Sequence, residues 1–190
     1  MLPIAGSGPT ERADAARNRQ KILRAAANLV ATRGVESLAL DEVAAEAGVG
    51  VGTVYRRYPD RGALAQALLD AQEREFQEAF LSGPPPLGPG APAKERIRAF
   101  LHAYVDRLET QGQLLMVAET ETPSARFITG AYRLHHNHLV TLIAQAEPDV
   151  DAHFRADALL APLAAAQFVY QRENGMSVDR IKAGFDQLVS

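Results

Sequence analysis

The chain has 190 residues, a formal net charge of −3 and no cysteine. The lack of cysteine excludes disulfides, thiolate metal sites and cysteine nucleophiles, and it fits the reducing cytoplasm in which we expect the protein to act. Hydrophobic residues make up 47% of the chain, yet no apolar run is long enough to cross a bilayer, and the opening residues lack the pattern of a secretory signal. No stretch alternates apolar and polar residues convincingly, so the sequence favours an all-α fold.

The first predicted helix covers residues 14–33. Its apolar residues recur at helical spacing on one face, and Gly34 follows the last of them, which suits the end of a helix. They are Ile22, Leu23, Ala26, Leu29 and Val30. Residues 12–24 also carry five basic side chains against one acid. This basic arm suits local docking on DNA, although the chain as a whole is negative.

Two short amphipathic helices joined by a glycine turn follow in residues 38–59. In the first, apolar residues recur at positions i, i+3, i+4 and i+7, and Gly48 comes next, where a left-handed cap needs a residue without Cβ. These apolar residues are Leu40, Val43, Ala44 and Ala47. The second helix is polar and basic and ends at Pro59. The pattern alone also fits a plain helical hairpin, but it is typical of a helix-turn-helix DNA reader whose second helix enters the major groove.

The rest of the chain is predicted to be helical as well. A fourth helix is expected at about 61–81, and a proline- and glycine-rich connector at 83–92 cannot sustain a helix. Five more helices are predicted beyond it, at 93–110, 113–120, 124–146, 151–171 and 177–189. The sequence thus predicts an all-α fold of about nine helices, in which a three-helix N-terminal head with the helix-turn-helix is joined to a helical C-terminal domain.

The N-terminal part resembles the DNA-binding domain of TetR-type transcriptional regulators. Two motifs carry the resemblance: "ILxAAxxLxxxxG" within residues 18–34 and "AGVxxGTxYxxY" within residues 43–59, followed by Asp60-Arg61-Gly62-Ala63-Leu64. The resemblance covers about residues 10–80 and is weak in residues 81–190. It implies a DNA-binding domain at 10–61 and a ligand-binding and dimerisation domain at 62–190. It also implies a homodimer that binds a palindromic operator in double-stranded DNA, as a repressor released by a small molecule.

The predicted DNA contacts lie on the second hairpin helix and the basic arm. Arg57 is the best candidate for reading a guanine, because a guanidinium can donate two parallel hydrogen bonds to that base. Arg56 and Arg61 suit phosphates, and in similar regulators the tyrosine that matches Tyr55 touches the DNA backbone. Thr53 can reach a base edge or a phosphate. The full predicted set is Arg17, Arg19, Val51, Gly52, Thr53, Tyr55, Arg56, Arg57 and Arg61.

Two positions depart from the family pattern. Where many such proteins cap the hairpin helices with serine or threonine, this chain has Ala39 and Gly50. Glycine is a tolerable N-cap and alanine a poor one. The second helix also starts with the non-polar pair Val51-Gly52. We therefore expect few direct hydrogen bonds to bases, a contact of Val51 with a thymine methyl, and part of the specificity from DNA shape.

The run 158–170 in the C-terminal part is almost wholly apolar, with Gln167 as its only strongly polar side chain. A helix that is apolar on every side must be covered on every side. It can be a central core helix, or it can pack on a second copy of the protein. Since similar regulators dimerise through their last two helices, we expect a homodimer formed by this run and by residues 178–189.

A pocket for a largely apolar effector with one or two polar groups is predicted around residues 124–146. There the apolar stripe passes through Ile128, His135 and Leu142, so His135 points inward, with Tyr132 and His138 one turn away on the same side. His136 points away. Partly polar residues on an inward face suit a mostly apolar pocket with a few orienting groups. The predicted lining is Phe100, Tyr104, Met116, Glu119, Phe127, Tyr132, His135 and His138.

Two other functions compete with this one. One is a helical DNA-binding dimer without a small-molecule effector. The other is a metal-dependent helical enzyme built on the histidines at 102, 135, 136 and 138 with Glu119 and Glu121. No glutamate lies between the histidines at the spacing of a helical zinc site, and no phosphate loop or serine nucleophile motif occurs. We therefore predict no catalytic residue, no metal site and no cofactor.

Overall fold

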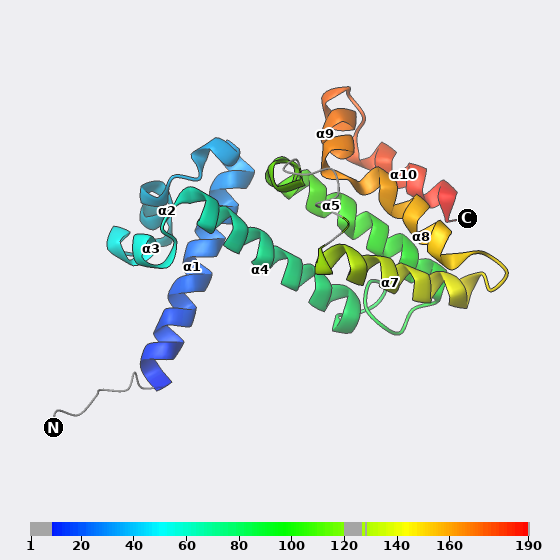
Figure 1. Cartoon of the computed structure of the whole chain (residues 1–190), viewed down its shortest axis with the longest axis horizontal. Helices are drawn as coiled ribbons and strands as arrows, with labels where there is room; N and C mark the ends of the chain where they lie inside the picture. The colour runs from blue at the N-terminus through cyan, green and yellow to red at the C-terminus, as the bar shows by residue number, and fades with distance from the viewer. Residues whose placement is uncertain (1–8, 120–126, 128, 190) are drawn as a thin grey trace. The chain divides into compact units, whose positions relative to one another are not determined.

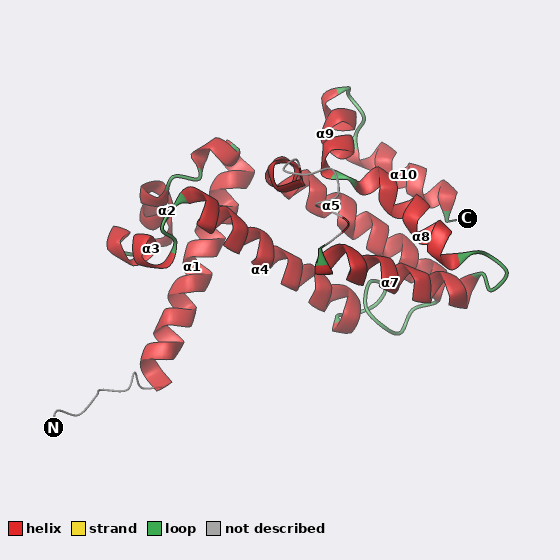
Figure 2. Ribbon diagram, viewed as in Figure 1, coloured by secondary structure: helices red, strands yellow, loops and turns green. Residues whose placement is uncertain are grey.

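The computed structural model describes residues 9–119, 127 and 129–189, without the side chains of 9–12, 36 and 117–119. Over these residues the chain forms nine α-helices and two short 3-10 helices, and it contains no strand (Figures 1 and 2). The predicted all-α fold is confirmed. The chain divides into two compact units, Met1–Ala71 and Gln72–Ser190. The predicted domain boundary, between residues 61 and 62, falls earlier, at the start of α4 (Arg61–Ser82). None of the described helices is long and apolar enough to span a membrane.

The N-terminal unit is built from three helices and the first part of α4. Helix α1 (Pro9–Arg33) leads through the 3-10 helix η1 (Val35–Ser37) to α2 (Leu40–Ala47) and α3 (Val51–Arg57). Helix α2 packs on both α1 and α3. The buried side chains that hold the unit together are Ile22, Leu23, Leu29, Leu38, Val43, Val54, Tyr58, Leu64 and Leu68. This core fixes α3 by Val54 and Tyr58 and leaves most of its other side chains at the surface.

The helix ends of this unit follow the sequence signals. Gly48 caps α2 in the left-handed region with φ 62°, as its position after the last apolar residue predicts. Ala39 and Gly50 are the N-cap residues of α2 and α3, and neither provides a side-chain hydrogen bond. At the start of α4, the backbone N–H of Ala63 donates to Oδ1 of Asp60 at 2.8 Å. The turn between α2 and α3 therefore depends on glycine, whereas α4 begins with a carboxylate cap.

The C-terminal unit contains the end of α4 and five further helices. They are α5 (Ala93–Glu119), α7 (Gly130–Ala146), α8 (Ala152–Leu160), α9 (Ala165–Glu173) and α10 (Val178–Leu188). Helix α5 runs through the middle of the unit, where it packs against α7, α9 and α10, while α8 packs on α7 (Figure 1). The core side chains come from all of these helices, so the unit has one continuous apolar interior.

Four of the predicted helices differ from the observed ones. The stretches 93–110 and 113–120 were expected to be separate, but α5 is continuous to Glu119, and Gly112 lies within it close to Val169 and Phe168. The predicted helix 151–171 is interrupted by the 3-10 turn η2 (Ala161–Leu163), which has Pro162 near its start. Proline cannot continue an α-helix because it lacks the amide donor. The predicted helix 124–146 begins at Gly130, and most of residues 124–128 lie outside the described residues.

Candidate DNA-binding surface and effector site

Helix α3 presents an exposed polar and apolar surface in the N-terminal unit. Val54 is fully buried, while Val51 and Tyr55 expose 46% and 47% of their surface. Arg56 and Arg57 are exposed as well, and neither has a hydrogen-bond or ion-pair partner among the described residues. This surface combines two free guanidinium groups, a tyrosine and a valine on a helix that is held from its other side. Such a helix can enter a groove and offer both charge and base-edge contacts.

The other predicted DNA contacts have different surroundings. Arg17 is exposed and pairs with Asp14 one turn earlier in α1. Arg19 and Thr53 are half-buried, and Gly52 is exposed. Arg61 donates from Nη2 to the backbone carbonyl of Val35, so its guanidinium links α4 to η1. In this position Arg61 stabilises the fold of the unit. To bind a DNA phosphate, its guanidinium must give up the hydrogen bond to Val35.

Four of the eight predicted effector residues come together in the C-terminal unit. Phe100 and Tyr104 of α5 meet His135 and His138 of α7, and ring centroids lie 5.8 Å apart for Phe100 and His135 and 5.3 Å apart for Tyr104 and His135. Phe100 is fully buried, and His135 exposes only 2% of its surface. The inward orientation predicted for His135 is therefore confirmed.

Two aromatic residues of α4 complete this group, and neither was predicted from the sequence. Phe76 lies 5.6 Å from Tyr104, and Phe80 lies 4.5 Å from His138, measured between ring centroids. Their spacing of four residues on a helix is the signal that could have identified them. We call these six residues the aromatic cluster: Phe76, Phe80, Phe100, Tyr104, His135 and His138.

A buried acid on α4, Glu73, lies beside the aromatic cluster and was not predicted either. Its Oε1 lies 2.8 Å from Nε2 of His135, and its Oε2 pairs with Arg107 of α5. Gln77 donates to Glu73 at 2.6 Å, and Nε of Arg107 donates to Gln111 at 3.1 Å. Burial raises the pKa of Glu73, but the hydrogen bond and charge of His135 and the charge of Arg107 outweigh burial, so that this pKa lies below its ordinary value. Glu73 is therefore held as a carboxylate.

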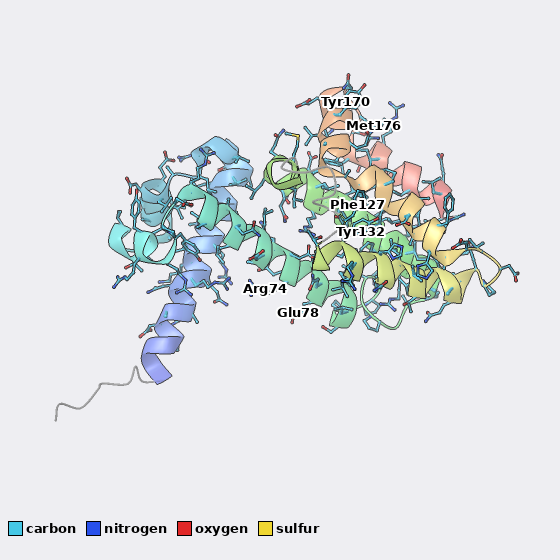
Figure 3. The ribbon with its side chains drawn as sticks, in the orientation of Figure 1. Arg74, Glu78, Phe127, Tyr132, Tyr170 and Met176 are labelled. Carbon is cyan, nitrogen blue, oxygen red and sulfur yellow. The ribbon has the colours of Figure 1, made fainter. Side chains whose placement is uncertain are left out.

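Three of the other four predicted effector residues do not join the aromatic cluster. Tyr132 donates from its hydroxyl to Asp157 of α8 at 3.1 Å, and its ring lies 5.1 Å from Phe127 (Figure 3). Phe127 exposes 53% of its surface. Met116 is half-buried against the core of the unit. The side chain of Glu119 lies outside the described residues.

His102 and His136 each pair with an aspartate. His136 points away from His135, as predicted, and its Nε2 lies 3.3 Å from Oδ1 of Asp157. His102 pairs with Asp186 at 2.9 Å. Within the described part of the chain, no group of three histidine, aspartate or glutamate side chains is arranged to hold a metal ion. The geometry offers an exposed helix surface in one unit and a buried, partly polar aromatic cluster in the other.

Comparison with known proteins supplies the context for these two features. The family model of the bacterial regulatory proteins of the tetR family matches residues 22–68, which contain α2 and α3. Residues 22–68 therefore form a DNA-binding domain of the TetR family. Among curated relatives, an HTH-type transcriptional regulator of Staphylococcus aureus is 25% identical over 164 residues, which are 86% of each chain.

Solved structures of TetR-family and related regulators share the fold. A putative TetR-family regulator from Rhodococcus sp. matches with a TM-score of 0.65 and 20% identity, over 92% of this chain and all of the other. A putative regulator from Saccharomonospora viridis in complex with choline has a TM-score of 0.74 and 20% identity, over 92% and 96% of the two chains. The regulator FadR from Bacillus subtilis in complex with stearoyl-CoA has a TM-score of 0.65 and 16% identity, over 90% and 97%.

Proposed function

We propose that this TetR-family regulator binds a palindromic site in double-stranded DNA as a homodimer and represses transcription until a small, largely apolar ligand releases it. The observation that carries the proposal is the exposed surface of α3, with two arginines that have no partner within the described residues. The proposed place of action is the cytoplasm. The regulator is proposed to have no catalytic activity.

The residues of α3 are assigned different tasks in this proposal. Arg57 reads a base through its two parallel donors, and Arg56 and Tyr55 bind phosphates. Val51 contacts a thymine methyl. Four further residues contribute to the DNA contact: Arg17, Arg19, Gly52 and Thr53. Arg61 contributes mainly by holding α4 to η1. With so few base contacts, DNA shape supplies part of the specificity.

The proposed dimer contact lies on α8, α9 and α10. Several apolar side chains of these helices are exposed although they belong to otherwise well-packed helices, including Ala158, Ala161, Tyr170 at 62% and Leu188 at 50%. Pro162, Met176, Ile181 and Phe185 line part of a groove of about 330 Å³ in the same region. Figure 3 marks Tyr170 and Met176 at the end of α9 and just beyond it. An apolar surface with a groove suits a second copy of the chain better than it suits water.

The proposed effector site is the region around the aromatic cluster. Six aromatic rings with a few polar groups match the usual character of a ligand site, which is mostly apolar with some orienting groups. Proteins of similar fold have been solved with choline and with stearoyl-CoA. These two molecules differ in charge and size, so they support an effector at this fold without naming the effector of this chain.

A reporter assay tests the proposal. The site that the protein selects from random DNA is inserted into the promoter of a reporter gene, and the protein is expressed in the same cells. We expect lower reporter expression with the protein than without it. Candidate effectors are compounds that raise the melting temperature of the protein, because a ligand that binds the folded state stabilises it. Addition of such a compound should restore reporter expression. Arg57→Ala should abolish the repression. Reporter expression that rises when the protein is present would contradict the repressor assignment.

A further inference from the structure

Two buried nitrogens beside Phe80 have no hydrogen-bond partner among the described residues. One is Nε of Arg96 on α5, and the other is Nε2 of His138 on α7. Arg96 donates from Nη2 to the backbone carbonyl of Phe80 at 3.2 Å, and the ring centroid of His138 lies 4.5 Å from that of Phe80. Both side chains therefore contact the same residue near the C-terminal end of α4. Buried polar atoms in native proteins nearly always have a partner, so an acceptor is expected here.

The charges around these nitrogens favour an acceptor that is an anion. Arg96 forms no ion pair among the described residues, and its one hydrogen bond goes to a neutral carbonyl. Glu73, the acid beside the aromatic cluster, is already shared by Arg107 and His135. Burial, together with the positive charges of Arg96 and His135, lowers the pKa of His138 to about 4. The region thus has more positive than negative charge, and the excess is carried by Arg96.

We propose that the effector of this regulator is an organic carboxylate, bound by Arg96 and His138 at its charged end and by Phe80 and Phe100 along its apolar part. The proposal rests on the effector function proposed above. A guanidinium is well matched to a carboxylate, and a neutral histidine protonated on Nε2 donates a second bond. Phe100 lies 5.3 Å from His138 between ring centroids, so both phenylalanines adjoin the polar pair.

Binding at this site has a consequence for α4. The rings of Phe80, Phe100 and His138 contact one another, with Phe80 and Phe100 5.2 Å apart between centroids. A carboxylate whose apolar part lies among them must move these rings, and Phe80 belongs to α4, the helix that continues into the N-terminal unit. Such a ligand would therefore have different affinities for two arrangements of α4. A ligand can change DNA binding only if its affinities for two such states differ.

The test is a matched ligand panel measured by thermal shift and calorimetry. Linear carboxylates from acetate to decanoate, and benzoate, are compared with the alcohols and primary amines of the same carbon skeletons. We expect at least one carboxylate to raise the melting temperature and release the selected DNA, while its alcohol and amine counterparts do neither.

Two variants and one control tie the effect to this site. Arg96→Gln and His138→Phe should each weaken carboxylate binding about tenfold or more, because each removes a hydrogen bond to a charged group. Arg98→Gln, on the same helix, removes a guanidinium that pairs with the exposed Asp186 and should leave the affinity unchanged. Near-native melting temperatures and DNA affinities of the variants would show that they fold.

Each other outcome counts against the proposal. If amines or alcohols bind and release DNA while carboxylates do not, the effector function stands and the carboxylate assignment falls. If carboxylates bind but Arg96→Gln and His138→Phe have no effect, the site is elsewhere. If no carboxylate of the panel binds, the assignment is overturned, and the reporter assay decides separately whether the protein represses at all.

Discussion

Glu73 of α4 and Arg107 of α5 form an ion pair inside the C-terminal unit, and their side chains expose only 14% and 8% of their surface. The guanidinium of Arg107 also lies 5.5 Å from the ring centroid of Phe76 and 5.7 Å from that of Tyr104. Because His135 of α7 contacts the same carboxylate, one acid holds three helices together. The removal of Glu73 would leave the guanidinium of Arg107 buried without its acidic partner.

Glu73→Leu should therefore destabilise the protein strongly. It leaves the buried guanidinium of Arg107 unpaired, and the loss of one partner of a buried pair costs about 3–5 kcal/mol. The free energy of unfolding, measured by urea denaturation, checks this. Glu78→Leu is the matched control, because Glu78 is exposed on the same helix and should change stability by less than about 0.5 kcal/mol. Similar losses in the two variants would mean that the ion pair contributes nothing specific.

Two buried groups should make the protein less stable in acid. The pKa of His138 is lowered from 6.5 to about 4, mainly by burial, so the unfolded chain binds more protons between these values and stability falls as the pH falls from 6.5 towards 4. The pKa of Glu73 lies below its ordinary value of 4.5, so its contribution to stability is lost as the pH falls below 4.5. Melting temperatures across this range test the prediction.

His138→Phe isolates the first of these effects. Phenylalanine keeps a ring against Phe80 but cannot be protonated, so the loss of stability between pH 6.5 and 4 should be smaller than in the unchanged protein. The same variant of His102, whose ring pairs with Asp186 near the surface, provides a comparison. An unchanged pH profile in His138→Phe would show that this histidine is not the group that titrates.

Local signals explain why the DNA-binding part could be predicted in detail. Gly48 and Pro59 mark the ends of the hairpin helices, and the positions of Val54 and Tyr58 follow from helical spacing alone. The function of α3 then depends on residues of a single short helix. In such a segment, the spacing of residues in the sequence largely determines which side chains share a face of the helix.

The effector region depends on contacts between distant parts of the chain, which spacing does not reveal. Glu73 meets Arg107 and His135 only because α4, α5 and α7 pack together, and no pattern within α4 distinguishes Glu73 from an exposed acid. Tyr132 is predicted to lie on the same side as His135, yet its hydroxyl bonds to Asp157 of another helix. Pro162 indicates a helix break, but the continuous apolar character of the run 158–170 favoured the prediction of a single helix.

Arg56 and Arg57 should have different effects on DNA binding. Arg57→Ala should cost about 1–3 kcal/mol and relax the preference at one position of each half-site, because it removes a base contact. Arg56→Ala should weaken binding to all sequences and reduce its dependence on salt, because it removes a phosphate contact. Fluorescence anisotropy at several salt concentrations distinguishes the two. Equal loss on specific and unrelated DNA for both variants would remove the base-reading role of Arg57.

The proposed dimer contact can be separated from the core of the unit. Tyr170 is 62% exposed, so Tyr170→Arg should leave the fold of each copy intact while it places a charge in the contact and produces monomers. Leu163 is fully buried, so Leu163→Arg should unfold the unit instead of acting on the dimer alone. Sedimentation and circular dichroism measure both properties. A Tyr170→Arg protein that stays dimeric would place the contact elsewhere.

The most direct measurement is a selection from random double-stranded DNA with the purified protein, followed by the mass of the complex with the selected duplex. A two-fold dimer with one α3 per half-site must select an inverted repeat whose halves lie about 34–36 Å apart or a multiple of that distance. We predict that the protein selects such a repeat and that an even number of copies binds it. The Arg57→Ala variant should no longer select this repeat. Enrichment of no sequence, or of a site without inverted symmetry bound by a single copy, would contradict the proposed function.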